Sequence, residues 1–141
     1  MLGRSDPRTV VEAFNRAWAD NDLDAAMAFV ADDATFVIHI DQPAIEHAGR
    51  WTGRDQIRRS LAISRSNFDY ILYRPIILGV SGEIVRVRIE YIGTHKASGE
   101  RLSMRFRHVM TVRDGLITHC DEYHDAAMLQ AFMQLVCSPQ Y

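Results

Sequence analysis

The sequence predicts an α+β fold in which a strongly curved, mainly antiparallel sheet forms a cone. Three N-terminal helices cover this cone and a C-terminal helix closes it. Apolar residues recur at helical spacing near both ends of the chain, in 7–20 and 126–136. Between them lie longer segments rich in β-branched residues, separated by Gly-containing turns that are typical of hairpins. Helices followed by a run of strands indicate an α+β arrangement.

Aspartates mark the starts of the predicted helices. Asp6 precedes Pro7, which is the pattern of an N-cap followed by proline at the first helical position. Asp22 and Asp125 stand in the same position before two further apolar segments. The predicted helices span 7–20, 23–30, 54–64 and 126–136.

The predicted strands are the segments with alternating or β-branched apolar residues. They span 35–40, 68–79, 83–95, 101–113 and 116–124. Residues 41–53 contain Pro43, Gly49 and Gly53 and are predicted to form a loop. The last two strands meet at Asp114-Gly115, a dipeptide that favours the positive φ of a tight hairpin.

Composition is that of an ordinary globular protein, and we expect one domain over residues 1–141. The 141 residues are 48% hydrophobic and 24% charged. The net charge is −2 and no basic run exceeds Arg58-Arg59, so nucleic acid is not an expected partner. No apolar stretch approaches the ~20 residues that span a bilayer, and the N-terminus lacks the apolar segment of a signal peptide. We therefore expect a reduced, cytoplasmic protein without membrane association.

The predicted hairpin carries the strongest chemical signal. Side chains alternate along a strand, so His108 falls in a row with five apolar residues: Leu102, Met104, Phe106, Met110 and Val112. Glu122 on the return strand lies roughly opposite His108. A register slip of one residue would turn Asp121 inward instead. Burial of Glu122 in an apolar pocket would raise its pKa, which suits an acid or base near neutral pH.

Further residues are candidates for the pocket wall. Phe14, Trp18 and Met110 are predicted to line it, and Trp51 is placed at its rim or lid in the 41–53 loop. His124 and Cys120 share the strand parity of Glu122, with Cys120 expected as a packing residue. The other histidines show no metal-ligand spacing, so no metal site is assigned. Charged side chains alternate outward, on the opposite face of the sheet: Arg86, Arg88, Glu90, Arg105 and Arg107.

Five short segments together resemble the nuclear transport factor 2-like superfamily, in its SnoaL-like polyketide cyclase and ketosteroid isomerase-like branch. The resemblance extends from about residue 7 to 135, and its order and spacing imply the cone fold. The segments are 22–29, 31–35, 53–57, 113–117 and 122–125.

The resemblance to ketosteroid isomerases implies three equivalent positions, which fall at Phe14, Ile38 and His108. Phe14 cannot donate a hydrogen bond and Ile38 cannot accept a proton, so steroid isomerisation by that mechanism is not expected. Ile38 then becomes part of the pocket wall. His39 or Asp41 would re-enter the pocket only through a bulge.

SnoaL-like cyclases are similar in pairing a histidine on the first strand of the hairpin with an acid on the second. This resemblance implies that Glu122 moves a proton and that His108 supports it and polarises a carbonyl. The expected function is a cyclase, isomerase or dehydratase acting without a cofactor on a small, apolar carbonyl compound. The alternative is a non-catalytic module that binds a small hydrophobic ligand or a partner protein. The resemblance also implies a homodimer through the outer face of the sheet.

Overall fold

The computed structural model describes residues 6–40 and 46–137. Within them the chain forms helices and strands in the following order: α1 (Pro7–Ala19), α2 (Leu23–Met27), β1 (Val30–His39), β2 (Gly49–Thr52), α3 (Arg54–Asn67), β3 (Phe68–Ser81), β4 (Ile84–His95), β5 (Arg101–Arg113), β6 (Leu116–Tyr123) and α4 (Ala126–Cys137). None of the described helices is both long and apolar enough to span a lipid bilayer.

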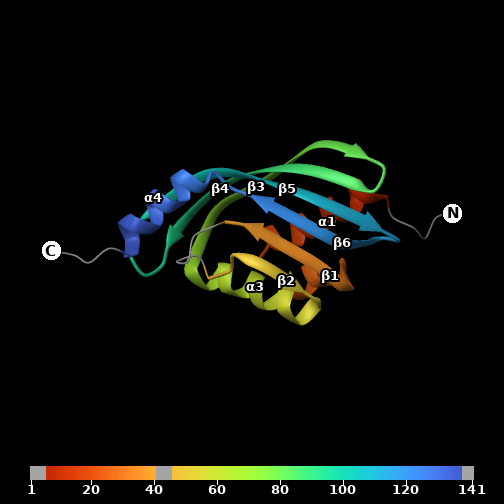
Figure 1. Ribbon diagram of the computed structural model, residues 1–141, viewed down its shortest axis with the longest axis horizontal. Coiled ribbons are helices and arrows are strands. Elements are labelled where there is room, and N and C mark those ends of the chain that lie inside the picture. Colours follow the sequence, from red (N-terminus) through yellow and green to blue (C-terminus); the bar gives the residue numbers. More distant parts are fainter. Residues whose placement is uncertain (1–5, 41–45, 138–141) are drawn as a thin grey trace.

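The strands form one six-stranded sheet in the order β2-β1-β6-β5-β4-β3. Strands β1 and β6 are parallel, and every other neighbouring pair is antiparallel. The sheet is curved but not closed, because β2 and β3 remain as its two edges. Figure 1 shows it arched over α1 and α3, with α4 at one end. This confirms the predicted α+β class.

The predicted caps and hairpin are present. The Asp6, Asp22 and Asp125 carboxylates accept hydrogen bonds from main-chain N–H groups three residues further along, at 2.8, 3.0 and 3.1 Å. Asp114 and Gly115 have φ values of 53° and 78°, as the tight turn between β5 and β6 requires.

Two predictions about the first half of the chain were wrong. The second helix ends at Met27 rather than 30, because β1 already starts at Val30, which pairs with Ile117 of β6. The main-chain N–H of Ile117 also donates to the Phe29 carbonyl at 2.7 Å. The predicted 41–53 loop contains strand β2, which pairs with β1 and was too short and glycine-flanked to show a pattern.

The concave face of the sheet meets the helices in a continuous apolar core. Alternate residues of β4 and β5 are buried, as the predicted inward parity requires. Helix α1 contributes Val10, Val11 and Phe14, and α3 contributes Ile57. Many outward residues of β4 and β5 are charged, and Glu90 lies near Arg74, Arg88 and Arg105. The core is incompletely filled, which leaves the cavity described next.

Candidate functional site

A cavity lies between the concave face of the sheet and helices α1, α3 and α4. Its empty volume is about 860 Å³, including the open solvent at its mouth. Small-molecule sites in proteins are commonly concave and mostly apolar. The residues that line it come from every element except α2 and β2: Phe14, Trp18, Phe36, Val37, Ile38, Ile40, His47, Ser60, Leu61, Ser64, Phe68, Tyr70, Tyr73, Tyr91, Leu102, Met104, Phe106, His108, Met110, Cys120, Glu122, His124 and Leu129.

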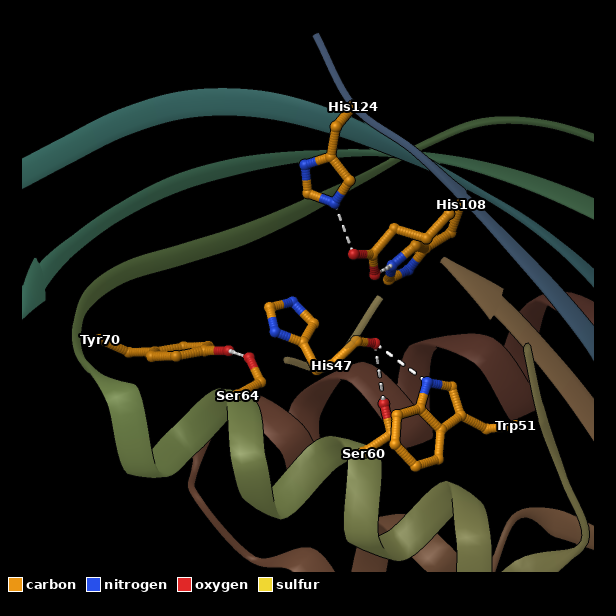
Figure 2. A network of polar contacts seen from close by, with 8 residues as sticks. His47, Trp51, Ser60, Ser64, Tyr70, His108 and His124 are labelled. Carbon is orange, nitrogen blue, oxygen red and sulfur yellow. Dashed lines mark hydrogen bonds and ion pairs between the residues drawn. The ribbon is translucent and has the colours of Figure 1, made fainter. Parts of the chain in front are cut away.

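A carboxylate held by two imidazoles forms the polar part of the cavity wall. His108 on β5 and Glu122 on β6 are directly opposite each other in the antiparallel register. His108 Nε2 lies 2.7 Å from Glu122 Oε1, and His124 Nε2 lies 2.5 Å from Oε2 of the same carboxylate. Since a carboxylate only accepts, both imidazoles donate to it. We call these three residues the inner cluster, and Figure 2 shows His108 and His124 converging on the shared carboxylate.

The inner cluster is nearly shielded from solvent. Side-chain exposure is 18% for Glu122, 7% for His108 and 3% for His124. The ring of His124 stacks on Phe106, with ring centroids 4.7 Å apart. Among the described residues, neither the His108 nor the His124 Nδ1 atom has a hydrogen-bond partner, and both atoms are buried. The atoms that can face a ligand are therefore the carboxylate oxygens rather than the second ring nitrogens.

The predicted rise in the pKa of Glu122 was wrong. Burial alone raises this pKa, but the electrostatic interaction with His124 and the hydrogen bonds from His108 and His124 outweigh it. The pKa of Glu122 consequently lies well below its usual range, and the group is an ionised carboxylate at neutral pH. Two donated hydrogen bonds favour the charged form more than the apolar surroundings oppose it.

A third histidine, His47, enters the cavity from the turn that precedes β2. Its main-chain carbonyl accepts hydrogen bonds from Trp51 Nε1 at 3.0 Å and from Ser60 Oγ at 3.4 Å. Burial lowers the pKa of its imidazole, more than the negative charge of Glu122 raises it. Figure 2 shows its ring pointing from the side of α3 toward His108 and His124.

Aromatic side chains form the wall beside α3. The hydroxyls of Tyr70 and Ser64 are 2.6 Å apart, and burial raises the pKa of Tyr70 to about 12. Trp18 packs edge-on against Tyr70, with centroids 5.7 Å apart, and also contacts Tyr73. The guanidinium of Arg65 lies 3.9 Å from the centre of the Tyr70 ring and donates to the Trp18 carbonyl. The wall beside α3 is therefore aromatic, with Trp18 standing edge-on to the two tyrosine rings.

Residues 11–120 match the family model of the SnoaL-like domain. The chain belongs to this family. The match spans most of the sequence and confirms the resemblance to the SnoaL-like branch of the nuclear transport factor 2-like superfamily. No curated protein sequence matches the chain significantly.

Solved structures share the fold of this SnoaL-like domain at low sequence identity. An NTF2-like protein from Burkholderia thailandensis is 24% identical, with a TM-score of 0.79 over 92% of this chain and 98% of its own. TerC, co-crystallised with polyporic acid, is 21% identical, with a TM-score of 0.81 over 95% and 100%. A candidate SnoaL-like polyketide cyclase from Mesorhizobium loti is 22% identical, with a TM-score of 0.69 over 83% and 97%.

The structure of the SnoaL-like domain brings all but one of the predicted site residues to the cavity: Phe14, Trp18, Ile38, His108, Met110, Cys120, Glu122 and His124. Trp51 is the exception, because it belongs to β2 and its indole N–H is used to hold the His47 main chain. The rim or lid role predicted for Trp51 is therefore not seen.

The register alternatives are also decided. Glu122 faces the cavity, and Asp121 faces the opposite side of the sheet, where His39 Nε2 lies 2.8 Å from its carboxylate. His39 therefore does not re-enter the pocket, and Asp41 lies outside the described residues. His119 Nε2 contacts the second oxygen of Asp121 at 3.1 Å. We call His39, Asp121 and His119 the outer cluster.

Several lining residues were missed or misplaced by sequence reasoning. Tyr91 is not among the predicted lining residues, although it shares the inward parity of the apolar residues on β4 and the signal was therefore present. Tyr70 was missed as well, and a register shift between Tyr70 and Leu72 disrupts the parity of β3. His47 lies in a turn without periodicity, and only the tertiary structure brings it to the cavity.

Within the described ranges, no group of three or more His, Cys, Asp and Glu side chains is arranged to hold a metal ion. In the inner cluster, the imidazole Nε2 atoms point at the carboxylate rather than at a shared point beside it. This geometry is that of a hydrogen-bonded acid–base group.

Proposed function

We propose that this SnoaL-like domain is an enzyme of cyclase, isomerase or dehydratase type that moves a proton on a small, apolar carbonyl compound. The observation that carries the proposal is the ionised Glu122, held by two imidazoles in the wall of an otherwise apolar cavity. A carboxylate in this position can remove a proton from a carbon next to a carbonyl group. The apolar and aromatic walls exclude water from the reacting atoms.

The roles within the inner cluster follow from its contacts. Glu122 would take the proton, while His108 and His124 keep it ionised and fix its orientation. The predicted role of His108 in polarising a carbonyl does not fit this arrangement, because its Nε2 already donates to Glu122 and its Nδ1 is buried. A separate donor is needed for the carbonyl oxygen.

The substrate class rests on the cavity. Its aromatic wall at Trp18, Tyr70 and Tyr73 suits an aromatic or polycyclic compound, and most of its lining surface is apolar. The co-crystallisation of TerC, which shares the fold, with polyporic acid supports a small organic ligand. The predicted homodimer through the outer face of the sheet stays a prediction.

A second candidate function is a non-catalytic module that binds a small hydrophobic ligand. It is favoured by Phe14 and Ile38, which line the cavity but have no group that can exchange a proton. The two functions differ in what the loss of the Glu122 charge would do. A binding module would keep its ligand affinity, and it would catalyse nothing in either form.

The test follows exchange of α-protons of β-tetralone, a bicyclic ketone, for deuterium in D₂O by NMR. We expect the wild type to accelerate exchange and Glu122→Gln to lower the rate by about 10²–10⁴-fold with the fold retained. Asp121→Asn is the matched control, since it removes the neighbouring carboxylate on the opposite face. If Glu122→Gln is as active as the wild type, Glu122 is not the base. If β-tetralone binds without exchange, the binding module is the better description.

A further inference from the structure

The proposed proton transfer leaves the carbonyl oxygen without an assigned partner. Removing an α-proton places negative charge on that oxygen, and enzymes stabilise it with a fixed hydrogen-bond donor in a site that excludes water. His108 and His124 both direct Nε2 to Glu122. Their Nδ1 atoms are buried and do not open onto the cavity. The donor must therefore come from another part of the wall.

We propose that His47 is this donor: a catalytic residue whose imidazole N–H binds the carbonyl oxygen of the substrate and stabilises the enolate. The proposal rests on the proposed function, and it assigns a residue that neither the sequence pattern nor the family match singles out. It also completes the site with two groups of different roles, a carboxylate on β6 and an imidazole from the turn before β2.

The position of His47 is fixed from two sides. Trp51 on β2 and Ser60 on α3 both donate to its main-chain carbonyl, at 3.0 and 3.4 Å. These contacts hold the main chain of His47 beside the cavity, and Figure 2 shows its ring directed toward His108 and His124. A donor that is held in place before the substrate arrives needs no reorganisation during the reaction.

The protonation state of His47 suits a donor next to an ionised base. Its buried ring is neutral at pH 7, because burial lowers its pKa more than the charges of Glu122 and Glu46 raise it, and His124 lowers it further. A neutral imidazole has one N–H donor and does not quench the carboxylate by forming an ion pair with it. Triosephosphate isomerase, a general example of this chemistry, also combines a carboxylate base with a neutral histidine.

Other donors in the wall are engaged or competing. The Ser60 hydroxyl donates to the His47 carbonyl. The Ser64 and Tyr70 hydroxyls share one hydrogen bond, which uses one of their two protons. Trp18, Tyr73 and Tyr91 also line the cavity and are competing donors, of which the experiment includes Tyr73.

The step balances with these groups alone. The Glu122 carboxylate removes the α-proton, and the electron pair of the broken C–H bond forms the carbon–carbon double bond. The π pair of the carbonyl moves to its oxygen, which is stabilised by the His47 N–H. Return of the proton from the Glu122 carboxyl to the same or a conjugated carbon regenerates the ketone and the ionised carboxylate.

The experiment measures the carbonyl stretch of β-tetralone, labelled with ¹³C at the carbonyl, by infrared difference spectroscopy on the bound ketone. We expect the wild type to shift the band to lower frequency relative to the ketone in hexane. His47→Phe should lose this shift, and His47→Gln should retain part of it through its amide N–H. Glu122→Gln should keep the shift although it does not catalyse exchange. His119→Phe, on the outer face, is the matched control and should match the wild type.

Exchange kinetics give a second readout. His47→Phe should reduce the turnover rate of α-proton exchange by about 10²-fold, with a smaller change in KM. If His47→Phe keeps both the band shift and the exchange rate, or if Tyr73→Phe alone abolishes the shift, the assignment is overturned. A wild type that shifts the carbonyl band but does not exchange protons would overturn the proposed function and leave His47 as the ligand-binding donor. An unshifted band in the wild type would overturn the His47 proposal.

Discussion

Strand β6 carries two neighbouring carboxylates on opposite faces, and each is held by two imidazoles. The pairs are His108 and His124 for Glu122 in the inner cluster, and His39 and His119 for Asp121 in the outer cluster. In both clusters the pKa of the carboxyl is lowered, since hydrogen bonds from imidazoles outweigh the effect of burial. The two clusters thus have the same chemical composition and the same sign of pKa shift.

Their surroundings differ. The imidazoles of the inner cluster are 7% and 3% exposed, whereas those of the outer cluster are 40% and 37% exposed. The inner cluster borders an apolar cavity, and the outer cluster lies on the other face of the sheet. The same three kinds of side chain therefore stand in two different environments. Of the two clusters, the inner one combines burial with space for a ligand.

The largest difference should appear when each carboxylate is removed. Glu122→Ala leaves two buried imidazoles without an acceptor, so we expect it to lower the free energy of unfolding by about 3 kcal/mol. Asp121→Ala breaks partly exposed contacts and should cost less than about 1 kcal/mol. Urea unfolding at pH 7 measures both. Equal costs would show that burial does not separate the two clusters.

A smaller difference should appear in acid. The pKa of Glu122 is well below its unfolded value of about 4.3, so native Glu122 binds fewer protons than unfolded Glu122 as the pH falls. Its stabilisation is fully present above that value and is lost toward the lower native pKa. The difference in the free energy of unfolding between the wild type and Glu122→Gln should thus shrink below about pH 4.3. Urea unfolding between pH 5 and 2 measures it, with Asp121→Asn as the comparison. A difference that grows in acid would contradict the lowered pKa.

The smallest difference should be the response to salt. Mobile ions screen exposed charges strongly and buried charges weakly. Raising NaCl from about 0.05 to about 0.5 M should reduce the effect of Asp121→Ala by about a few tenths of a kcal/mol and leave that of Glu122→Ala nearly unchanged. Chemical unfolding with urea, which adds no ions, is suitable. A stronger salt response of Glu122→Ala would mean that solvent ions reach the inner cluster.

Much of the fold was predictable because local chemistry decided it. The aspartate caps, the Asp114-Gly115 turn and the alternation along β4 and β5 all act within a few residues. Strand alternation also placed His108 and Glu122 opposite each other, and the structure confirms that pairing. The early start of β1 and the existence of β2 were missed, since both depend on a partner strand that is distant in sequence or has no pattern of its own.

The direction of the Glu122 pKa shift could not be predicted from the sequence. The sequence predicted that the Glu122 carboxyl is buried among apolar side chains, and burial considered alone raises the pKa of a carboxyl group. The two imidazoles together reverse that sign. His124 lies beyond the end of β6, and its ring stacks on Phe106 and contacts the carboxylate. The pattern showed that His124 was on the correct side, but it did not show the contact.

The sequence by itself determined the class of fold, the parity of β4 and β5 and the pairing of an imidazole with a carboxyl on the inner face. These properties depend on the periodicity of apolar residues and on turn residues, and both are determined by residues that are close in sequence. Only the tertiary structure decided that Glu122 is ionised, that Trp51 supports a main-chain carbonyl, and that His47 enters the cavity. Each of these depends on contacts between groups from separate elements in a space shielded from water. Such contacts produce no periodic pattern in the sequence.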